Sequence, residues 1–152
     1  MSSKLRKQID VEWAMLHQLL EDHSPLLQKC CVVAPDRIEV SALAAMLHGF
    51  YCGLENVLKR ISVETNEPLS KTPGWHKELL GAMTRSSAKR PAVLTIGTAC
   101  IVREYLEFRH FFRSAYPFQL RWERMAHLAC DCEKTLQCFQ NEVETFLLEM
   151  GY

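Results

Sequence analysis

The segment from Arg103 to Tyr116 carries the residue types that could handle a phosphodiester. It reads Arg-Glu-Tyr-Leu-Glu-Phe-Arg-His-Phe-Phe-Arg-Ser-Ala-Tyr. On a helix with about 100° per residue, two adjoining sectors hold the polar groups: Arg109, Arg113 and Tyr116 in one, and Arg103, His110 and Ser114 in the other. We therefore predict a basic stripe of these six residues, with Phe108 and Phe111 on an opposite, apolar side.

Arginine and histidine suit phosphate chemistry for different reasons. The planar guanidinium grips a phosphate with two hydrogen bonds and stabilises negative charge in a transition state. Histidine moves a proton near neutral pH, and the ribose 2′-hydroxyl is itself a nucleophile, so RNA cleavage does not require a metal. We expect the helix C-terminus to raise the pKa of His110. The alternative is a solvated face on which Glu104 and Glu107 form ion pairs with the arginines.

The amino-acid composition indicates the size of the folded unit and the balance of its charges. The 152 residues are 48% hydrophobic, and 18 basic residues balance 18 acidic ones. This predicts one folded domain over residues 1–152 and excludes a disordered chain. Nucleic acid would then have to bind a local cluster, such as the arginines between Arg103 and Arg121, rather than a globally basic surface. Two copies related by a two-fold axis would double this cluster, which predicts a homodimer with a basic cleft.

The remaining polar and small residues predict no cofactor site. Seven cysteines in a reducing compartment favour free, mostly buried thiols, and Cys130 with Cys132 lacks the second ligand pair that zinc needs. We therefore expect neither a metal nor another cofactor. His17 and His48 are interpreted as satisfied histidines at the edge of the core. Small residues at Gly49 and Gly53, together with Ala42 and Ala45, favour close helix packing.

The N-terminal sequence is charged and lacks the apolar run of a secretory signal, and no stretch approaches the roughly 18 apolar residues of a membrane span. We therefore expect a cytoplasmic protein that does not enter a membrane.

Apolar residues recur at steps of three and four nearly everywhere, which indicates helices. The pattern predicts a first helix around residues 9–27 that Pro25 kinks or restarts, a second from the N-cap Asp36 to about residue 65, and a short third that begins at Thr72 and Pro73. After a basic loop, a fourth helix should run from Thr95 to about residue 115, followed by an unbroken ladder over residues 125–150. The fold class is thus all-α, an antiparallel bundle of four long helices plus one short helix.

Several motifs in this order resemble a known family. Phe-Arg-His-Phe-Phe-Arg-Ser-Ala-Tyr at 108–116 is followed by Phe-Gln-Leu at 118–120 and Trp-Glu-Arg at 122–124. Earlier come Met-Leu-His-Gly-Phe-Tyr at 46–51, Leu-Glu-Asn at 54–56 and Gly-Trp-His-Lys-Glu-Leu-Leu at 74–80. The chain resembles the HepT-like branch of the HEPN superfamily over nearly its whole length.

The resemblance implies a homodimeric, metal-independent ribonuclease that acts as the toxin of a toxin–antitoxin pair, with a nucleotidyltransferase as antitoxin. The family motif is an Arg, four to six residues, a His, then often one residue and a Tyr. Arg109, Ser114 and Tyr116 fit this frame, with Ser114 at the histidine position. Tyr116 stands where the family's tyrosine can accept adenylyl groups from the antitoxin.

Serine at position 114 leaves two hypotheses open, because a serine is not a general base at neutral pH unaided. In the first, the protein is an RNA endonuclease in which His110 substitutes, since Arg103, six residues and His110 also satisfy the looser spacing. Arg109, His110 and Ser114 are then the candidate catalytic residues, and Arg103, Arg113 and Arg121 bind phosphate. In the second, the protein is a non-catalytic module that binds RNA, a nucleotide or a partner. A purely structural scaffold is the third alternative.

Overall fold

A computed structural model describes residues 3–152, without the side chain of residue 3. The elements in chain order are α1 (Ser3–Cys30), α2 (Arg37–Glu64), α3 (Trp75–Ala82), α4 (Ile96–Ser114), the 3-10 helix η1 (Pro117–Gln119), α5 (Trp122–Cys130) and α6 (Cys132–Glu149). This confirms the predicted all-α helical bundle, and the described residues contain no strand. No helix between residues 3 and 152 is long and apolar enough to cross a membrane.

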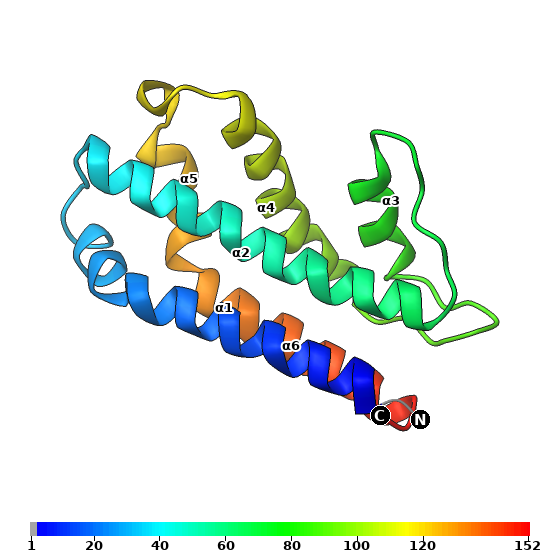
Figure 1. The fold of residues 1–152 in the computed structure, drawn as a ribbon. Coiled ribbons are helices and arrows are strands. Elements are labelled where there is room, and N and C mark those ends of the chain that lie inside the picture. The colour runs from blue at the N-terminus through cyan, green and yellow to red at the C-terminus, as the bar shows by residue number, and fades with distance from the viewer. Residues whose placement is uncertain (1–2) are drawn as a thin grey trace.

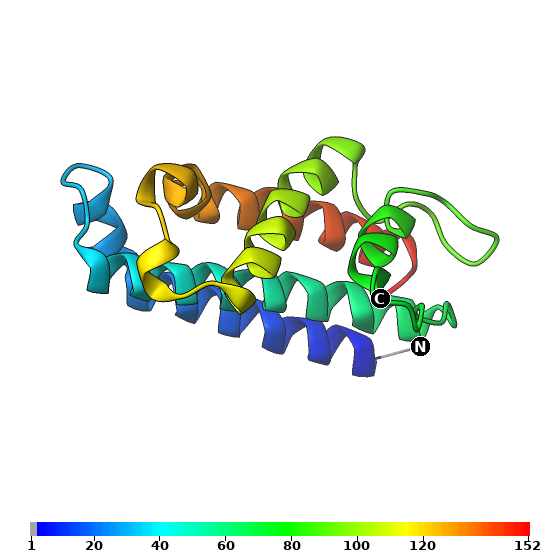
Figure 2. The same ribbon diagram turned by 90° about the horizontal axis from the view of Figure 1, so that it is seen from above.

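The long helix α2 lies at the centre of the arrangement. It runs antiparallel to α1, while α4 crosses it and α3 packs near its C-terminal end (Figure 1). Helix α6 returns beside α1, and this brings the two ends of the chain to the same side of the molecule. The view from above shows α1 and α2 on one side, with α4, α5 and α6 covering the other (Figure 2). Helix α2 therefore packs against α1 on one side and against α4 and α5 on another.

Local sequence explains where these helices begin. Asp36 forms the predicted N-cap of α2: its carboxylate accepts from the Glu39 N–H at 2.8 Å, and the Glu39 carboxylate accepts from the Asp36 N–H at 3.1 Å. Thr95 caps α4 by accepting from the Thr98 N–H at 3.2 Å. Helix α3 begins two residues after the predicted Pro73, with Gly74 as its N-cap.

Two long segments test the predicted helix boundaries. Helix α1 continues through Pro25 to Cys30 as one helix, and its last turns bend away from the helix axis, which agrees with the predicted kink (Figure 2). The ladder over residues 125–150 divides at Asp131 into α5 and α6 (Figure 1). One non-helical residue leaves the spacing of apolar residues almost unchanged, so the pattern alone predicts one continuous helix.

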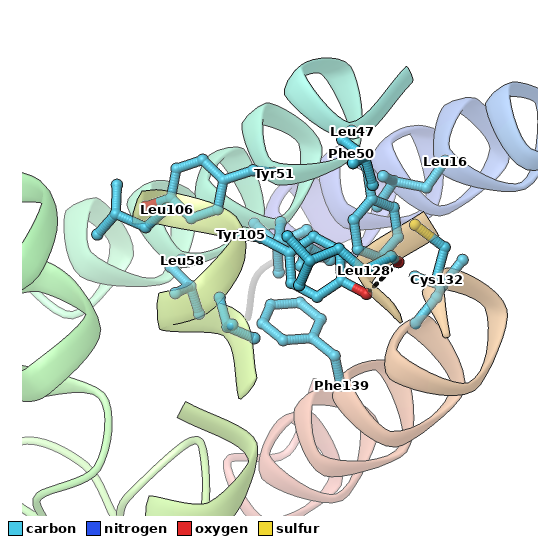
Figure 3. Close-up of a cluster of buried hydrophobic side chains, with 14 of the residues drawn as sticks. Leu16, Leu47, Phe50, Tyr51, Leu58, Tyr105, Leu106, Leu128, Cys132 and Phe139 are labelled. Carbon is cyan, nitrogen blue, oxygen red and sulfur yellow. Dashed lines mark hydrogen bonds between the residues drawn. The ribbon is translucent and has the colours of Figure 1, made fainter. Parts of the chain in front are cut away.

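The core is built around three aromatic rings from different helices (Figure 3). Phe50 of α2, Tyr105 of α4 and Phe139 of α6 are all at most 1% exposed, and the rings of Phe50 and Tyr105 lie 5.1 Å apart. The Tyr105 hydroxyl donates a 2.7 Å hydrogen bond to the carbonyl oxygen of Leu128 in α5, and burial raises the pKa of Tyr105. This bond fixes α4 against α5 and orients the face of α4 that carries the candidate site.

The cysteines differ from the prediction of free, mostly buried thiols. Cys31 and Cys130 form a disulfide between the α1–α2 connection and the end of α5, with Cα atoms 6.6 Å apart. Of the remaining five, Cys30 and Cys132 are buried, while three are exposed or half-buried: Cys52, Cys100 and Cys138. The folded topology joins cysteines that are 99 residues apart in sequence, a proximity that spacing along the chain does not reveal.

The two glycines of α2 contribute differently to its contact with α1. A Cβ added to Gly53 would lie 2.5 Å from Cδ2 and 2.8 Å from Cγ of Leu16, which is 2% exposed. At Gly49 the nearest atom would be Cδ2 of Leu19 at 3.4 Å, an ordinary contact. The predicted role in close packing therefore applies to Gly53.

We predict that Gly53→Ala destabilises the fold by about 1–3 kcal/mol, because the methyl group must displace a buried leucine. Gly49→Ala is the matched control and should stabilise α2 by about 0.8–1 kcal/mol through helix propensity. Urea denaturation of both variants measures the difference. A Gly53→Ala midpoint at or above that of Gly49→Ala would contradict the close contact.

Candidate functional site

The orientation of α4 places Arg109 toward the core. Val102, Tyr105 and Leu106 are buried, and Arg109 follows at the spacing that continues their face of the helix. Phe111, by contrast, is 46% exposed. The predicted division of α4 therefore holds only in part. Arg103, His110, Arg113 and Ser114 are exposed and Phe108 packs against the core, as predicted, whereas Arg109 lies on the apolar side and Phe111 is exposed.

The Arg109 guanidinium is half-buried and has no ion-pair partner among residues 3–152. Its Nε and Nη1 atoms are buried without a hydrogen-bond acceptor. The acidic residues that could have neutralised it have other partners: Glu104 contacts His127 at 2.9 Å, and Glu107 contacts Arg103 at 3.5 Å. Arg103 therefore has an ion-pair partner on the surface, whereas the charge of Arg109 is uncompensated.

His48 of α2 is the second unsatisfied group. Its Nε2 atom lies 3.8 Å from Sγ of Cys52, but its Nδ1 atom is buried without a partner, so the histidine is satisfied at one nitrogen only. His17, by contrast, bonds to Gln140 at 3.0 Å. The His48 ring lies 5.4 Å from the ring of Phe112. Burial lowers the pKa of His48, and the positive charges of Arg109 and Arg113 lower it further. His48 and the two arginines therefore act on one another electrostatically.

A buried hydrogen-bond network lies farther along α2. The Tyr51 hydroxyl donates to Oε2 of Glu55 at 2.7 Å, and His76 Nδ1 lies 2.6 Å from the same oxygen. Their exposed fractions are 2% for Tyr51, 5% for Glu55 and 8% for His76. Burial raises the pKa of Tyr51, and the hydrogen bond to Glu55 raises it further. This network connects α2 to α3.

His110 lies on the side of α4 that faces α3. Its ring meets the ring of His76 edge-on, with centroids 5.7 Å apart and planes at 75°. Burial lowers the pKa of His110, and the neighbouring His76 and Arg109 lower it further. The prediction that the helix terminus raises this pKa is wrong, because loss of water and basic neighbours outweigh the helix dipole. The lowered pKa favours the neutral imidazole, which is the form that a general base needs.

The other predicted site residues lie at or beyond the end of α4. Ser114 is exposed in the last position of the helix, where its hydroxyl donates to the carbonyl oxygen of Phe111 at 3.3 Å. Tyr116 is 67% exposed, and its ring stacks on Phe118 with centroids 5.4 Å apart. Arg121 lines a separate groove between α4 and α5 and lies apart from Arg109.

The structure thus divides the predicted stripe into different environments. Arg109 and Arg113 act on both His48 and His110, the His110 ring faces His76 of α3, and Arg103 pairs on the surface with a glutamate. Four contributing residues were not predicted from the sequence as site residues: His48, Tyr51, Glu55 and His76. The first three recur at spacings of three and four in one helix, a polar stripe that could have indicated a buried site.

The fold and site define a class of protein: an all-α bundle in which a half-buried arginine of α4 and a half-buried histidine of α2 each keep polar atoms without a hydrogen-bond partner and influence each other electrostatically. The chain belongs to the family of HepT-like proteins, because the model of that family matches residues 42–150. The match begins within α2 and continues to the C-terminal end of the last helix, so it includes the whole candidate site. No curated protein and no solved structure matches the chain.

We predict that Arg109→Met makes the protein more stable by about 1–2 kcal/mol, because a buried donor without an acceptor is removed while the unbranched side chain is kept. Arg103→Met is the matched control on the same helix. That side chain is 56% exposed, so its replacement should change stability by no more than about 0.5 kcal/mol. Urea denaturation measures both effects. A lower stability of Arg109→Met would mean that the folded protein already compensates the charge.

Proposed function

We propose that the protein is an RNA endonuclease toxin of a toxin–antitoxin pair that cleaves RNA in the cytoplasm. The observation that carries this proposal is the uncompensated Arg109 guanidinium beside His48 and Arg113. A cation without a counterion in a partly dry site favours an anionic ligand, and a phosphodiester supplies that charge. Membership of the HepT-like family supports a toxin module.

The chemistry assigns different steps to the two kinds of side chain. His110 takes the proton of a ribose 2′-hydroxyl, O2′ bonds to phosphorus, and the bond from phosphorus to O5′ breaks. The leaving O5′ takes a proton from water, so the products are a 2′,3′-cyclic phosphate and a 5′-hydroxyl. Arg109 and Arg113 stabilise the negative charge on the phosphoryl oxygens. The 2′-hydroxyl is the nucleophile, so the reaction needs no metal.

Dimerisation and a partner complete the proposal. One copy supplies Arg109 and Arg113, with Arg103 and Arg121 at the periphery, and a second copy across a two-fold axis would form a basic cleft. A nucleotidyltransferase antitoxin would inhibit the dimer. The second candidate function is a binding module without catalysis, which the exposed Ser114 at the motif position favours.

We predict that the purified protein cleaves single-stranded RNA and that His110→Ala lowers the rate by roughly 100-fold or more. Arg109→Met should lower it comparably through loss of transition-state stabilisation. His17→Ala changes an exposed histidine of α1 and serves as the control, with no expected effect. Ser114→His restores the family motif and should increase the rate. Electrophoresis of a labelled RNA measures each rate, and growth arrest on expression should follow the same order.

Binding without cleavage would contradict the nuclease and favour the binding module. In that case the wild-type protein leaves RNA intact, its affinity falls as salt rises, and Arg109→Met weakens binding. The genes beside the coding sequence give an independent test, since absence of a neighbouring nucleotidyltransferase gene would argue against the toxin proposal.

Tyr116 is our proposed modification site, because its ring is 67% exposed and follows the end of α4 directly. Incubation with the partner nucleotidyltransferase and ATP should add an adenylyl group to the Tyr116 oxygen with release of pyrophosphate. The added bulk and negative charge would block RNA from the cleft. Peptide mass spectrometry locates the modification, with Tyr116→Phe as the control. An unmodified Tyr116 would overturn this assignment.

A further inference from the structure

Glu55 is a buried carboxylate that the proposed reaction leaves without a role. It is 5% exposed, and its Oε2 atom is shared by the Tyr51 hydroxyl at 2.7 Å and by His76 Nδ1 at 2.6 Å. Hydrogen bonds from two helices satisfy a group that water does not reach. Because a carboxylate oxygen accepts hydrogen bonds, the proton between Glu55 and His76 belongs to Nδ1.

His76 is held on several sides. Its ring stacks on Trp75 with centroids 3.7 Å apart, and the Lys59 ammonium lies 5.7 Å from the centroid of the Trp75 ring. The His76 side chain is 10% exposed, so RNA does not reach most of it. Its ring contacts His110 edge-on at 5.7 Å. His76 therefore connects the fixed carboxylate of Glu55 to the exposed histidine of α4.

We propose that Glu55 and His76 are positioning residues that hold the His110 imidazole in place for proton transfer. The Tyr51 hydroxyl holds the Glu55 carboxylate, and the Trp75 ring stacks on His76, so the His76 ring keeps one orientation. The His110 ring therefore packs against a fixed partner. The role in RNA cleavage rests on the proposed function, whereas the effect of His76 on His110 can be measured without RNA.

All the charged groups that act on His110 directly are basic. Helix α3 contributes His76 and Lys77, and α4 contributes Arg109 and Arg113. Glu55 of α2 contacts His76 rather than His110, so it acts through that ring. Because positive neighbours disfavour a second positive charge, removal of His76 should make His110 easier to protonate.

Histidine resonances of the full-length protein, followed by NMR as a function of pH, test this inference. In His76→Gln the titration midpoint of His110 should move to higher pH by roughly half a pH unit. Glu55→Gln keeps the shape of the side chain but removes the negative charge 2.6 Å from His76 Nδ1, so it should also shift the His110 midpoint. His17→Gln is the control and should leave the His110 midpoint unchanged.

The pH at which RNA cleavage is lost on acidification should shift together with the titration midpoint of His110. A base must be unprotonated, so the rate falls as pH drops through the pKa of His110, and His76→Gln should lose activity at a higher pH than the wild type. Thermal unfolding identifies which variants are folded. The Tyr51→Phe variant lacks one hydrogen-bond donor to Glu55 and is a milder change of the same network.

Two results separate this inference from the proposed function. An unchanged His110 midpoint in folded His76→Gln and Glu55→Gln proteins overturns the positioning role, even where the wild type cleaves RNA. A shifted midpoint supports the role of the pair, even where no RNA is cleaved and the nuclease proposal itself fails.

Discussion

The burial of α2 is the constraint on which the rest of the structure depends. Thirteen of its 28 residues are buried, and it contacts α1, α3, α4 and α5. Polar groups on such a helix reach little water, so they must find partners inside the protein or remain unsatisfied. Tyr51 and Glu55 find a partner in His76 of α3, whereas His48 keeps an orphan nitrogen opposite Arg109. The same constraint therefore produces a rigid network and an unsatisfied site within two turns of one helix.

These two kinds of buried polar group have different consequences. The satisfied network fixes geometry, because each of its three side chains is held by another and each residue is at most 8% exposed. We expect the guanidinium to lower the stability of the free protein, since two of its buried nitrogens have no hydrogen-bond acceptor. An anion that binds only the folded state would recover this loss, which would couple anion binding to stability. In the proposed function, Arg109 thus contributes to ligand binding rather than to packing.

The sequence predicts the helices well but not their orientation. Apolar periodicity and the capping residues Asp36 and Thr95 define α2 and α4, because these signals are local. The same rotation of 100° per residue does not show which sector of α4 faces α2, so Arg109 was placed on a solvated stripe. Glu55 and His76 are 21 residues apart, and only the folded contact between α2 and α3 brings them together. The break between α5 and α6 at Asp131 leaves the spacing of apolar residues almost unchanged, so that spacing does not predict the break.

The positions of Ser114 and His110 explain how the proposed site could dispense with a histidine at the motif position. Ser114 ends α4, and its hydroxyl donates to the carbonyl oxygen of Phe111 in its own helix. His110 lies four residues earlier, about 6 Å along the axis, where α3 covers part of it. A proton-transfer group at position 114 would be exposed at the end of α4. The His110 ring, by contrast, packs against the His76 ring, which Glu55 holds. In the proposed enzyme, substitution at the motif position therefore moves proton transfer toward α3, and the RNA must approach between α3 and the C-terminal half of α4.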